Sequence, residues 1–355
     1  MTINFNAGPA GIAAQVLEKA QAELLNYAGS GISIMEASHR GDDFQAVIDA
    51  AEAGLRRLIN IPDDYEVLFL QGGASTQFAM IPMNLRPDGS ADYIDSGAWS
   101  SKAIKEAKIL GQGTEVIASS KDANYNYIPA DFTVNPDAKY LHVTSNNTIF
   151  GTQFAAYPDS GDVPLIADMS SDIMSREIDV SKFGMIYAGA QKNMGPSGIT
   201  LVILRKDLAE RAPDNLPSML NYTTHIAAGS MYNTPPTFAI YLIKLVCEWV
   251  ESLGGIAAIE KMNNEKAALL YSEIDSDDFY TGSAQEGSRS KMNVCFNLAN
   301  EELEAAFIKE ATELVMIGLK GHRSVGGIRA SIYNAMPIEG VEELVDFMKI
   351  FREKN

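Results

Sequence analysis

Short apolar runs recur between residues 60 and 205 and are separated by stretches with a mixed, helix-like pattern. Short apolar runs bounded by turn formers are typical of buried strands. They occur at Glu66–Leu70, Ala91–Asp95, Tyr140–Thr144, Val163–Asp168, Met185–Ala188 and Ile199–Leu204. Strands that alternate with helices form sheets with helices on both faces. We therefore expect an α/β fold with a mainly parallel sheet.

The pattern is helical on either side of this region. Helices are expected at about 13–25 and 44–59. A longer core helix begins at Pro235-Pro236 and ends at Gly254-Gly255. Its apolar run contains Lys244 and Glu248, and it is therefore too polar for a membrane span.

From about residue 260 the pattern indicates a small α+β domain. Helices are expected at 256–274, 301–314 and 341–351, and strands at 291–298 and 328–333. We therefore expect a large cofactor-binding domain over residues 16–258 and a small domain over residues 259–355, joined by the N-terminal segment 1–15.

Composition and charge narrow the possible partners. The 355 residues carry a formal net charge of −18, which argues against nucleic acid and against anionic membrane surfaces. Cys247 and Cys295 lie in apolar patterns without metal-ligand spacing, which favours buried free thiols, no metal and a reducing compartment. The N-terminus lacks the basic region and apolar core of a signal peptide. We expect a cytoplasmic protein.

A single lysine follows the strand at Met185–Ala188. Asn193, Gly195 and Pro196 come directly after Lys192 and prevent an immediate helix. A lysine on a tight turn between two core strands is poorly solvated, which lowers its pKa and makes its amine a nucleophile able to form a Schiff base. Taken alone, Lys192 could instead be an ordinary surface lysine without a catalytic role.

A carboxylate ends an earlier strand. Asp168 follows the run Val163–Ala167, and open α/β sheets bind ligands at the carboxyl ends of their strands. Such an aspartate could pair with the protonated pyridine nitrogen of pyridoxal 5'-phosphate, whereas a turn aspartate is the alternative. Asp168 and Lys192 together are stronger evidence than either residue alone.

A glycine-rich turn, Gln71-Gly-Gly-Ala-Ser-Thr76, follows the strand at Glu66–Leu70. Two glycines and then small hydroxyl residues at the start of a helix direct backbone N–H groups and the positive helix end toward an anion. A purely conformational strand-to-helix turn is the alternative. Beside Lys192 and Asp168, the turn is the expected site of a cofactor phosphate.

Longer motifs show a family resemblance over nearly the whole chain. The stretches Ile166-Ala-Asp-Met-Ser-Ser-Asp-Ile-Met-Ser-Arg-Glu-Ile-Asp-Val180 and Ala188-Gly-Ala-Gln-Lys-Asn-Met-Gly-Pro196 resemble the phosphoserine aminotransferases. These are fold-type I pyridoxal-phosphate enzymes of class V. The resemblance begins at Asn4-Phe-Asn-Ala-Gly-Pro9 and extends to Ser331-Ile-Tyr-Asn-Ala-Met-Pro337.

The resemblance implies a reaction and its substrates. The amino group of L-glutamate would pass to 3-phosphohydroxypyruvate by a ping-pong route, giving 2-oxoglutarate and O-phosphoserine for serine biosynthesis. A related reaction on 4-phosphohydroxy-threonine, in pyridoxine biosynthesis, is also implied.

The resemblance also assigns cofactor contacts. Lys192 would hold the cofactor covalently, and Asp168 would keep its pyridine nitrogen protonated. Asn233 and Thr234 would reach the cofactor phosphate of the neighbouring subunit, which implies a homodimer with shared active sites. The remaining contacts would come from Ala74, Ser75 and Gln191 at the phosphate, Trp99 on the ring face and Thr148 at the phenolic oxygen.

Arginines and histidines would bind the substrate. In the resembling family, Arg329 holds the α-carboxylate, while His322 and Arg323 hold the distal anion together with His39 and Arg40 from the other subunit. Arginine grips carboxylates and phosphates in bidentate fashion, although a solvated ion pair is the alternative for any one of these residues. Such a site concentrates positive charge within an acidic protein.

One position departs from the family pattern. Some members carry an arginine in the glycine turn where this chain has Ser75. The distal-anion site of this chain therefore has one cation fewer, or takes one from elsewhere in the chain.

Other functions remain as alternatives. Another class V enzyme, such as an alanine–glyoxylate type aminotransferase, is the first of them. A cysteine desulfurase needs a cysteine on a mobile loop, whereas Cys247 and Cys295 lie in a helix and a strand pattern. A dinucleotide-binding oxidoreductase would show Gly-x-Gly-x-x-Gly after its first strand, which this chain lacks. A non-catalytic binding protein would not need the lysine, the aspartate and the arginines.

Overall fold

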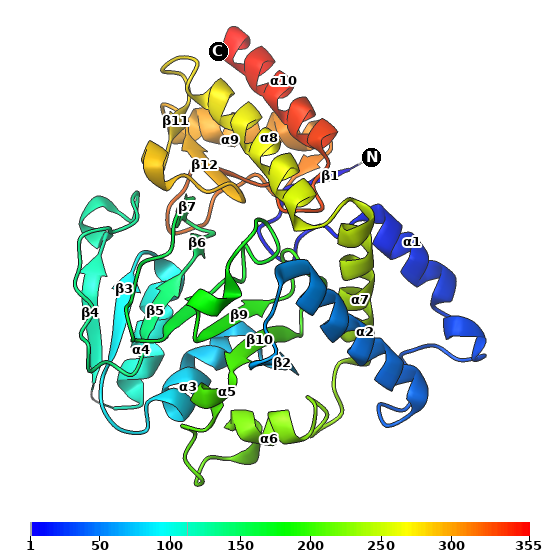
Figure 1. Ribbon diagram of the computed structural model, residues 1–355. Coiled ribbons are helices and arrows are strands. Elements are labelled where there is room, and N and C mark those ends of the chain that lie inside the picture. The colour runs from blue at the N-terminus through cyan, green and yellow to red at the C-terminus, as the bar shows by residue number, and fades with distance from the viewer. Residues whose placement is uncertain (1, 112) are drawn as a thin grey trace.

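A seven-stranded mixed sheet lies at the centre of the fold, with strand order β2-β10-β9-β8-β5-β3-β4 (Figure 1). The computed structural model describes residues 2–111 and 113–355. β10 is antiparallel to β2 and β9, and the other neighbours pair in parallel, so the predicted α/β fold is confirmed. The strands are β2 (Tyr65–Leu70), β3 (Ala91–Asp95), β4 (Thr114–Ser119), β5 (Leu141–Thr144), β8 (Leu165–Asp168), β9 (Met185–Gly189) and β10 (Thr200–Arg205).

Helices cover both faces of this sheet because alternate residues of each strand point to opposite sides. Val67 and Phe69 of β2 belong to the core shared with α2 and α7, whereas Leu68 and Leu70 belong to the core shared with α3 and α4. Burial on both faces explains why the strands read as continuous apolar runs. The helices are α1 (Ala14–Glu23), α2 (Asp42–Ile59), α3 (Gly73–Leu85), α4 (Ala98–Ile109), α5 (Lys206–Ala209), α6 (Tyr222–Ala227) and α7 (Thr237–Ser252).

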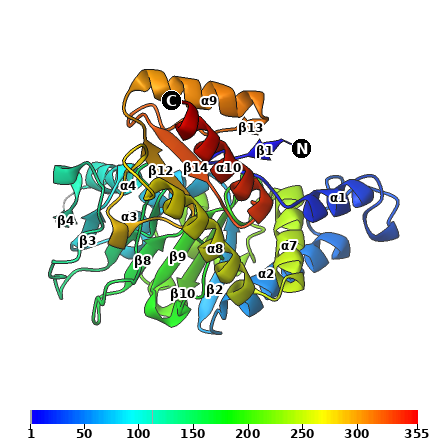
Figure 2. The same ribbon diagram turned by 90° about the horizontal axis from the view of Figure 1, so that it is seen from above.

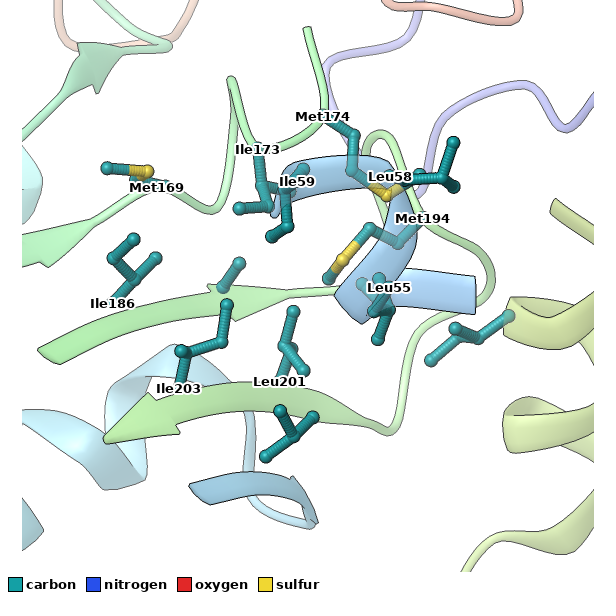
Figure 3. Packing of buried hydrophobic residues seen from close by; sticks show 14 of the residues in the cluster. Leu55, Leu58, Ile59, Met169, Ile173, Met174, Ile186, Met194, Leu201 and Ile203 are labelled. Atoms are coloured by element: carbon teal, nitrogen blue, oxygen red, sulfur yellow. The ribbon is translucent and has the colours of Figure 1, made fainter. Parts of the chain in front are cut away.

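The core on the α2 side also anchors two loops that follow strand ends. Figure 3 shows Leu55 and Ile59 of α2 directed toward Leu201 of β10, with Met169 and Met194 in the same cluster. Methionine side chains adapt to irregular gaps in such cores. Met169 directly follows the strand β8, and Met194 lies on the turn after β9, so this packing fixes both strand ends.

A second core lies beside the first (Figures 1 and 2). It is built on a three-stranded antiparallel sheet and includes Phe296, Phe307 and Phe351, together with the fully buried Phe5 of the N-terminal segment. The boundary predicted between residues 258 and 259 stays a prediction. The elements are β11 (Thr281–Gly282), β12 (Asn293–Asn297), β14 (Ile328–Ser331), α8 (Ile256–Ile274), α9 (Glu301–Glu313) and α10 (Ile338–Lys354).

The N-terminal segment runs from the second core to the main sheet. Its strand β1 (Ile3–Asn4) pairs in parallel with β13 (Met316–Ile317). A few residues later the Ala10 amide donates to the Gln191 carbonyl over 2.9 Å, on the turn after β9. A small hairpin, β6 (Asn146–Asn147) with β7 (Thr152–Gln153), follows the end of β5.

Some elements differ from the sequence-based prediction. The strand β4 is absent from that prediction, because it lies at the sheet edge and leaves all six of its residues at least partly exposed. The strand β14 ends at Ser331 rather than near Tyr333, because the next carbonyls accept hydrogen bonds from a buried lysine instead of a strand.

That lysine is Lys266 of α8, which is fully buried. Its Nζ donates to the carbonyls of Ile332, Tyr333 and Met336 at 2.8–3.1 Å. An ammonium has three donors and no acceptor, so these carbonyls satisfy it completely. The lysine thereby fixes the loop that follows the β14 strand.

Two further predictions concern burial and membranes. Cys247 and Cys295 are both buried and unpaired, as expected. No helix in the described parts of the chain is long and apolar enough to cross a membrane.

Candidate active site

Lys192 lies on the turn between β9 and β10, as predicted. The amides of Met194 and Gly195 close this turn by donating to the Ala190 carbonyl. The lysine side chain is partly buried, and its Nζ donates to Thr148 Oγ1 over 2.6 Å. Desolvation lowers the pKa of Lys192 to about 8. Its amine is therefore neutral, and nucleophilic, at a much lower pH than that of an ordinary lysine.

Asp168 lies at the carboxyl end of β8 and is buried. The amide and the hydroxyl of Ser170 both donate to Oδ1, at 2.9 and 2.6 Å, so a further donor would bind at Oδ2. The Ser170 hydroxyl in turn accepts from the Gly189 amide at the end of β9. Burial raises the pKa of Asp168, while the hydrogen bonds from Ser170 and the charge of Lys192 oppose that rise.

The glycine turn ends where α3 begins, at Gly73, and no side chain caps the first helical turn. Gly72 has a φ of +92°, and a Cβ there would lie 2.1 Å from Thr76 Oγ1, so only glycine fits. Ala74 and Ser75 belong to the first turn, whose N–H groups have no partner within a helix. The turn therefore offers backbone donors and a positive helix end to an anion.

Trp99 lies in the first turn of α4 and packs against the same core as Ala74. The Nζ of Lys192 is 5.9 Å from the centroid of its ring. Its indole Nε1 is buried and makes no hydrogen bond within the described residues. A ligand attached to Lys192 would therefore lie next to this ring.

Arg329 approaches Lys192 from β14 of the second core. Its Nη1 donates to the Thr148 carbonyl over 3.4 Å, and its positive charge contributes to the lowered pKa of Lys192. Its Nε is buried without a hydrogen-bond partner in residues 2–111 and 113–355. A buried guanidinium donor left unpaired costs free energy, which an anionic ligand would relieve.

The loop between β13 and β14 carries His322 and Arg323. Val325 of this loop packs against a small cluster of Tyr125, Ile149 and Phe150, and Trp99 of α4 packs against the same cluster. The loop of the two residues predicted for the distal anion and the start of α4 therefore share one hydrophobic cluster.

His322 is surrounded by positive charge. Its Nδ1 makes a 2.7 Å hydrogen bond with Ser324 Oγ. Burial lowers the pKa of His322, and so do the charges of Arg329, Arg323 and Lys102. The mutual repulsion of these groups indicates a place that favours an anion.

The remaining predicted residues make no hydrogen bond or ion pair with Lys192 within the described residues. His39 is half-buried and Arg40 exposed on the loop before α2, and no hydrogen bond or ion pair in the described residues joins them to the other predicted site residues. Asn233 donates to Gln71 Oε1 at 3.1 Å, and Gln71 donates to the Thr234 carbonyl at 3.1 Å. Both thus lie beside Gln71, the first residue of the glycine turn.

Two residues near the site are absent from the sequence-based prediction. Gly8 has a φ of +144°, and a Cβ there would lie 3.5 Å from Cγ of Lys192, so the N-terminal segment contacts the lysine stem. Lys102 holds its Nζ 4.0 Å from the centroid of the Trp99 ring. The only sequence signal for Lys102 is its spacing of three residues from Trp99 on a helix.

The residues present fit pyridoxal 5'-phosphate. The group needs an amine that is reactive near neutral pH, a carboxylate for its pyridine nitrogen and donors for its phosphate. Lys192, Asp168 and the uncapped start of α3 supply these three features. The unpaired Nε of Arg329 adds a place for a carboxylate beside them.

The lowered pKa of Lys192 predicts an unusual pH dependence. In the protein without cofactor, acetylation of Lys192 by trace acetic anhydride should rise with pH around a midpoint near 8, because only the neutral amine reacts. Peptide mass spectrometry measures the extent at each pH. The same lysine in denatured protein should show a midpoint near about 10.4.

Two variants test the cause of that shift. Arg329→Met should raise the midpoint because it removes a cation that lowers the pKa of Lys192, and Asp168→Asn should lower it. A folded protein with the midpoint of the denatured chain would contradict the assignment.

Comparisons with known proteins agree with this geometry. Residues 2–344 match the family described as Aminotransferase class-V. The chain is 59% identical to a phosphoserine aminotransferase of Desulfatibacillum aliphaticivorans over 99% of this chain and 98% of that one. A solved phosphoserine aminotransferase from Bacillus circulans subsp. alkalophilus is 52% identical, with a TM-score of 0.98 and coverage of 100% and 99%.

A more distant structure gives the same result. The pyridoxal-phosphate-bound phosphoserine aminotransferase of Trichomonas vaginalis is 39% identical, with a TM-score of 0.94 over 98% of this chain and 100% of that one. Identity at this level over the full length of both chains establishes the family. The chain belongs to the phosphoserine aminotransferase family of the class V aminotransferases.

Proposed function

We propose that this chain transfers the amino group of L-glutamate to 3-phosphohydroxypyruvate, with pyridoxal 5'-phosphate as cofactor, and releases O-phosphoserine and 2-oxoglutarate. The observation that carries this proposal is the pairing of two features. An amine with a pKa of about 8 lies beside an arginine whose Nε has no partner in the described residues. The site can therefore both react with a carbonyl and hold a carboxylate next to it.

Lys192 moves protons in this mechanism. When bound, pyridoxal phosphate supplies an electron sink that stabilises charge on the substrate Cα. The Lys192 amine would remove the proton from Cα as general base and deliver it to the C4' carbon of the cofactor as general acid, a role that suits a pKa near the working pH. Thr148 Oγ1, 2.6 Å from Nζ, positions the amine.

Asp168 and the first turn of α3 hold the cofactor. The Asp168 carboxylate, oriented by Ser170, keeps a proton on the pyridine nitrogen. The amides of Ala74 and Ser75 bind the phosphate, with Gln191 beside them on the turn of Lys192. Trp99 covers the ring and limits the access of water.

Cations select the substrate. Arg329 binds the α-carboxylate, and His322 and Arg323 bind the distal anion. The sequence contains 46 acidic residues, yet no ion pair in the described residues involves either arginine. Arginines without a carboxylate partner in the protein favour a dianionic substrate over a neutral one. A neutral substrate would leave the guanidinium groups desolvated and unpaired, which costs free energy.

The two remaining pairs, His39 with Arg40 and Asn233 with Thr234, act across a homodimer interface in this proposal. Large apolar side chains near them are exposed in the single chain: Met35 is 53% and Tyr232 49% exposed. In the proposed dimer the second copy of the chain would cover these side chains. The active site would then be complete only in the dimer.

Two further predictions belong to this proposal. The presence of a separate core with its own sheet supports a small domain over residues 259–355, completed by Phe5, beside a large domain over residues 16–258. The two buried, unpaired cysteines support a cytoplasmic location, where thiols stay reduced.

The absorption spectrum of the purified holoprotein tests the function. Adding O-phosphoserine should bleach the visible band of the bound cofactor, because the amino group passes to it. L-Alanine, which lacks a distal anion, should leave the band almost unchanged. A band bleached equally by alanine would favour an alanine–glyoxylate type activity. The absence of a band after incubation with pyridoxal phosphate would contradict any activity that depends on this cofactor.

A further inference from the structure

Lys102 places a positive charge above the face of Trp99. It lies on α4, three residues after the tryptophan, and its Nζ is 4.0 Å from the ring centroid. The ammonium is attracted to the ring face, which restricts a long and otherwise mobile side chain. Lys102 is therefore held beside the residue that adjoins Lys192.

The loop of His322 and Arg323 packs against the same small cluster as the start of α4. Val325 of this loop and Trp99 of α4 both pack against the cluster of Tyr125, Ile149 and Phe150. The charge of Lys102 is also among those that lower the pKa of His322. The shared cluster and the electrostatic effect together place Lys102 near the loop of His322 and Arg323.

Lys102 forms no ion pair within residues 2–111 and 113–355. Some surface lysines pair with carboxylates, as Lys19 and Lys244 do with Glu248, and others do not, so it is the position of Lys102 over the Trp99 ring that distinguishes it. In a chain with 46 acidic and 28 basic residues, unpaired cations gathered at one place indicate a ligand that is itself an anion.

We infer that Lys102 is a specificity-determining residue that binds the distal phosphate of the substrate together with His322 and Arg323. This inference rests on the proposed function. The ammonium is a flexible point charge with three donors and can leave the Trp99 ring to meet a phosphate oxygen. A phosphate carries more negative charge than the γ-carboxylate of glutamate, so Lys102 favours the phosphorylated substrate of the two.

A non-reacting pair of ligands isolates this contact. 3-Phosphoglycerate carries the carboxylate and phosphate of the substrate but a hydroxyl in place of its keto group, and D-glycerate lacks only the phosphate. Isothermal titration calorimetry of the holoprotein gives the Kd of each. Lys102→Met keeps the apolar stem over Trp99 and removes the charge, Lys102→Arg keeps the charge, and Lys105→Met removes another exposed lysine of α4.

Lys102→Met should weaken the binding of 3-phosphoglycerate by about tenfold, the effect of losing one charge-assisted hydrogen bond. It should change the Kd of D-glycerate by less than about twofold, and Lys105→Met should change neither. Lys102→Arg should restore most of the lost affinity. An unchanged cofactor absorption band in every variant shows that Trp99 and Lys192 keep their arrangement.

The outcomes separate the two proposals. If the unaltered protein binds both ligands equally, the distal-anion site itself is wrong, and with it the proposed substrate. If the unaltered protein prefers 3-phosphoglycerate and Lys102→Met retains that preference, only the role of Lys102 is overturned. Equal losses for both ligands in Lys102→Met would also overturn it, because such a change reports a disturbed site rather than a lost phosphate contact.

Discussion

Replacing Lys192 by alanine should leave a folded protein whose turnover falls by at least about 10⁴-fold, the full contribution of a positioned acid–base group. The loss should affect every amino donor alike, because the lysine acts on the Cα proton that all donors share. Steady-state rates with glutamate and with O-phosphoserine measure it. Lys182→Ala, which removes an exposed lysine shortly before β9, is the matched control and should retain full activity.

The same variant should be no less stable than the unaltered protein. The pKa of Lys192 is lowered chiefly by desolvation, so its ammonium is disfavoured in the folded state at neutral pH. Its removal should leave the thermal midpoint unchanged or slightly higher, since reactive sites are kept at some cost to stability. Retention of normal turnover by Lys192→Ala would contradict the proposed role, whereas a large fall in the thermal midpoint would show that the turn had unfolded.

Replacing Arg329 and Arg323 should separate the two ends of the substrate. Arg329→Ala should lower kcat/KM for every amino donor by about 10²–10³-fold, because it removes a partly buried charge partner of the α-carboxylate. Arg323→Ala should lower it by about tenfold for glutamate and O-phosphoserine only, because Arg323 is exposed and, in the proposed site, binds the distal anion. Rates of cofactor bleaching with O-phosphoserine, glutamate and alanine measure the split.

Controls keep the arginine comparison interpretable. Arg57→Ala removes an exposed arginine of α2 that pairs with Glu251 and should change no donor. Arg329→Lys should recover only part of the lost rate, since a lysine cannot reproduce a bidentate grip. Equal losses on alanine and on glutamate in Arg323→Ala would contradict the division between the two arginines.

The strands of the main sheet and the candidate catalytic residues at their ends can be predicted from the sequence because both depend on short segments. Each buried strand is one apolar run, and Asp168 and Lys192 lie where two of these runs end. The direction of β10 cannot be predicted from its apolar run. The connection between β9 and β10 is short, and a short connection permits β10 to run antiparallel to β9 within an otherwise parallel sheet. The edge strand β4 escapes prediction because half-exposed residues give no clear apolar run.

The contacts that sequence reasoning does not find are those made between distant segments. In the sequence, Lys266 has the appearance of an ordinary polar residue on a helix. Its burial is explained only by the carbonyls of the loop after β14, which accept its hydrogen bonds. Lys102 reads as a surface lysine, and the loop of His322 that gives it a role is about 220 residues away in the chain. The contact between Gly8 and the side chain of Lys192 likewise joins two residues that are far apart in the sequence.

The pairing of β1 with β13 has a consequence for synthesis in the cell. Ile3 pairs with Met316, so the first strand is made about 310 residues before its partner, a delay of roughly 15–60 s at ordinary translation rates. The main sheet can form during this interval, but Phe5 has no core to enter until residues 267–351 have been made. The N-terminal segment that contacts Lys192 therefore docks late, and a nascent chain that has not reached these residues would hold an unfinished site.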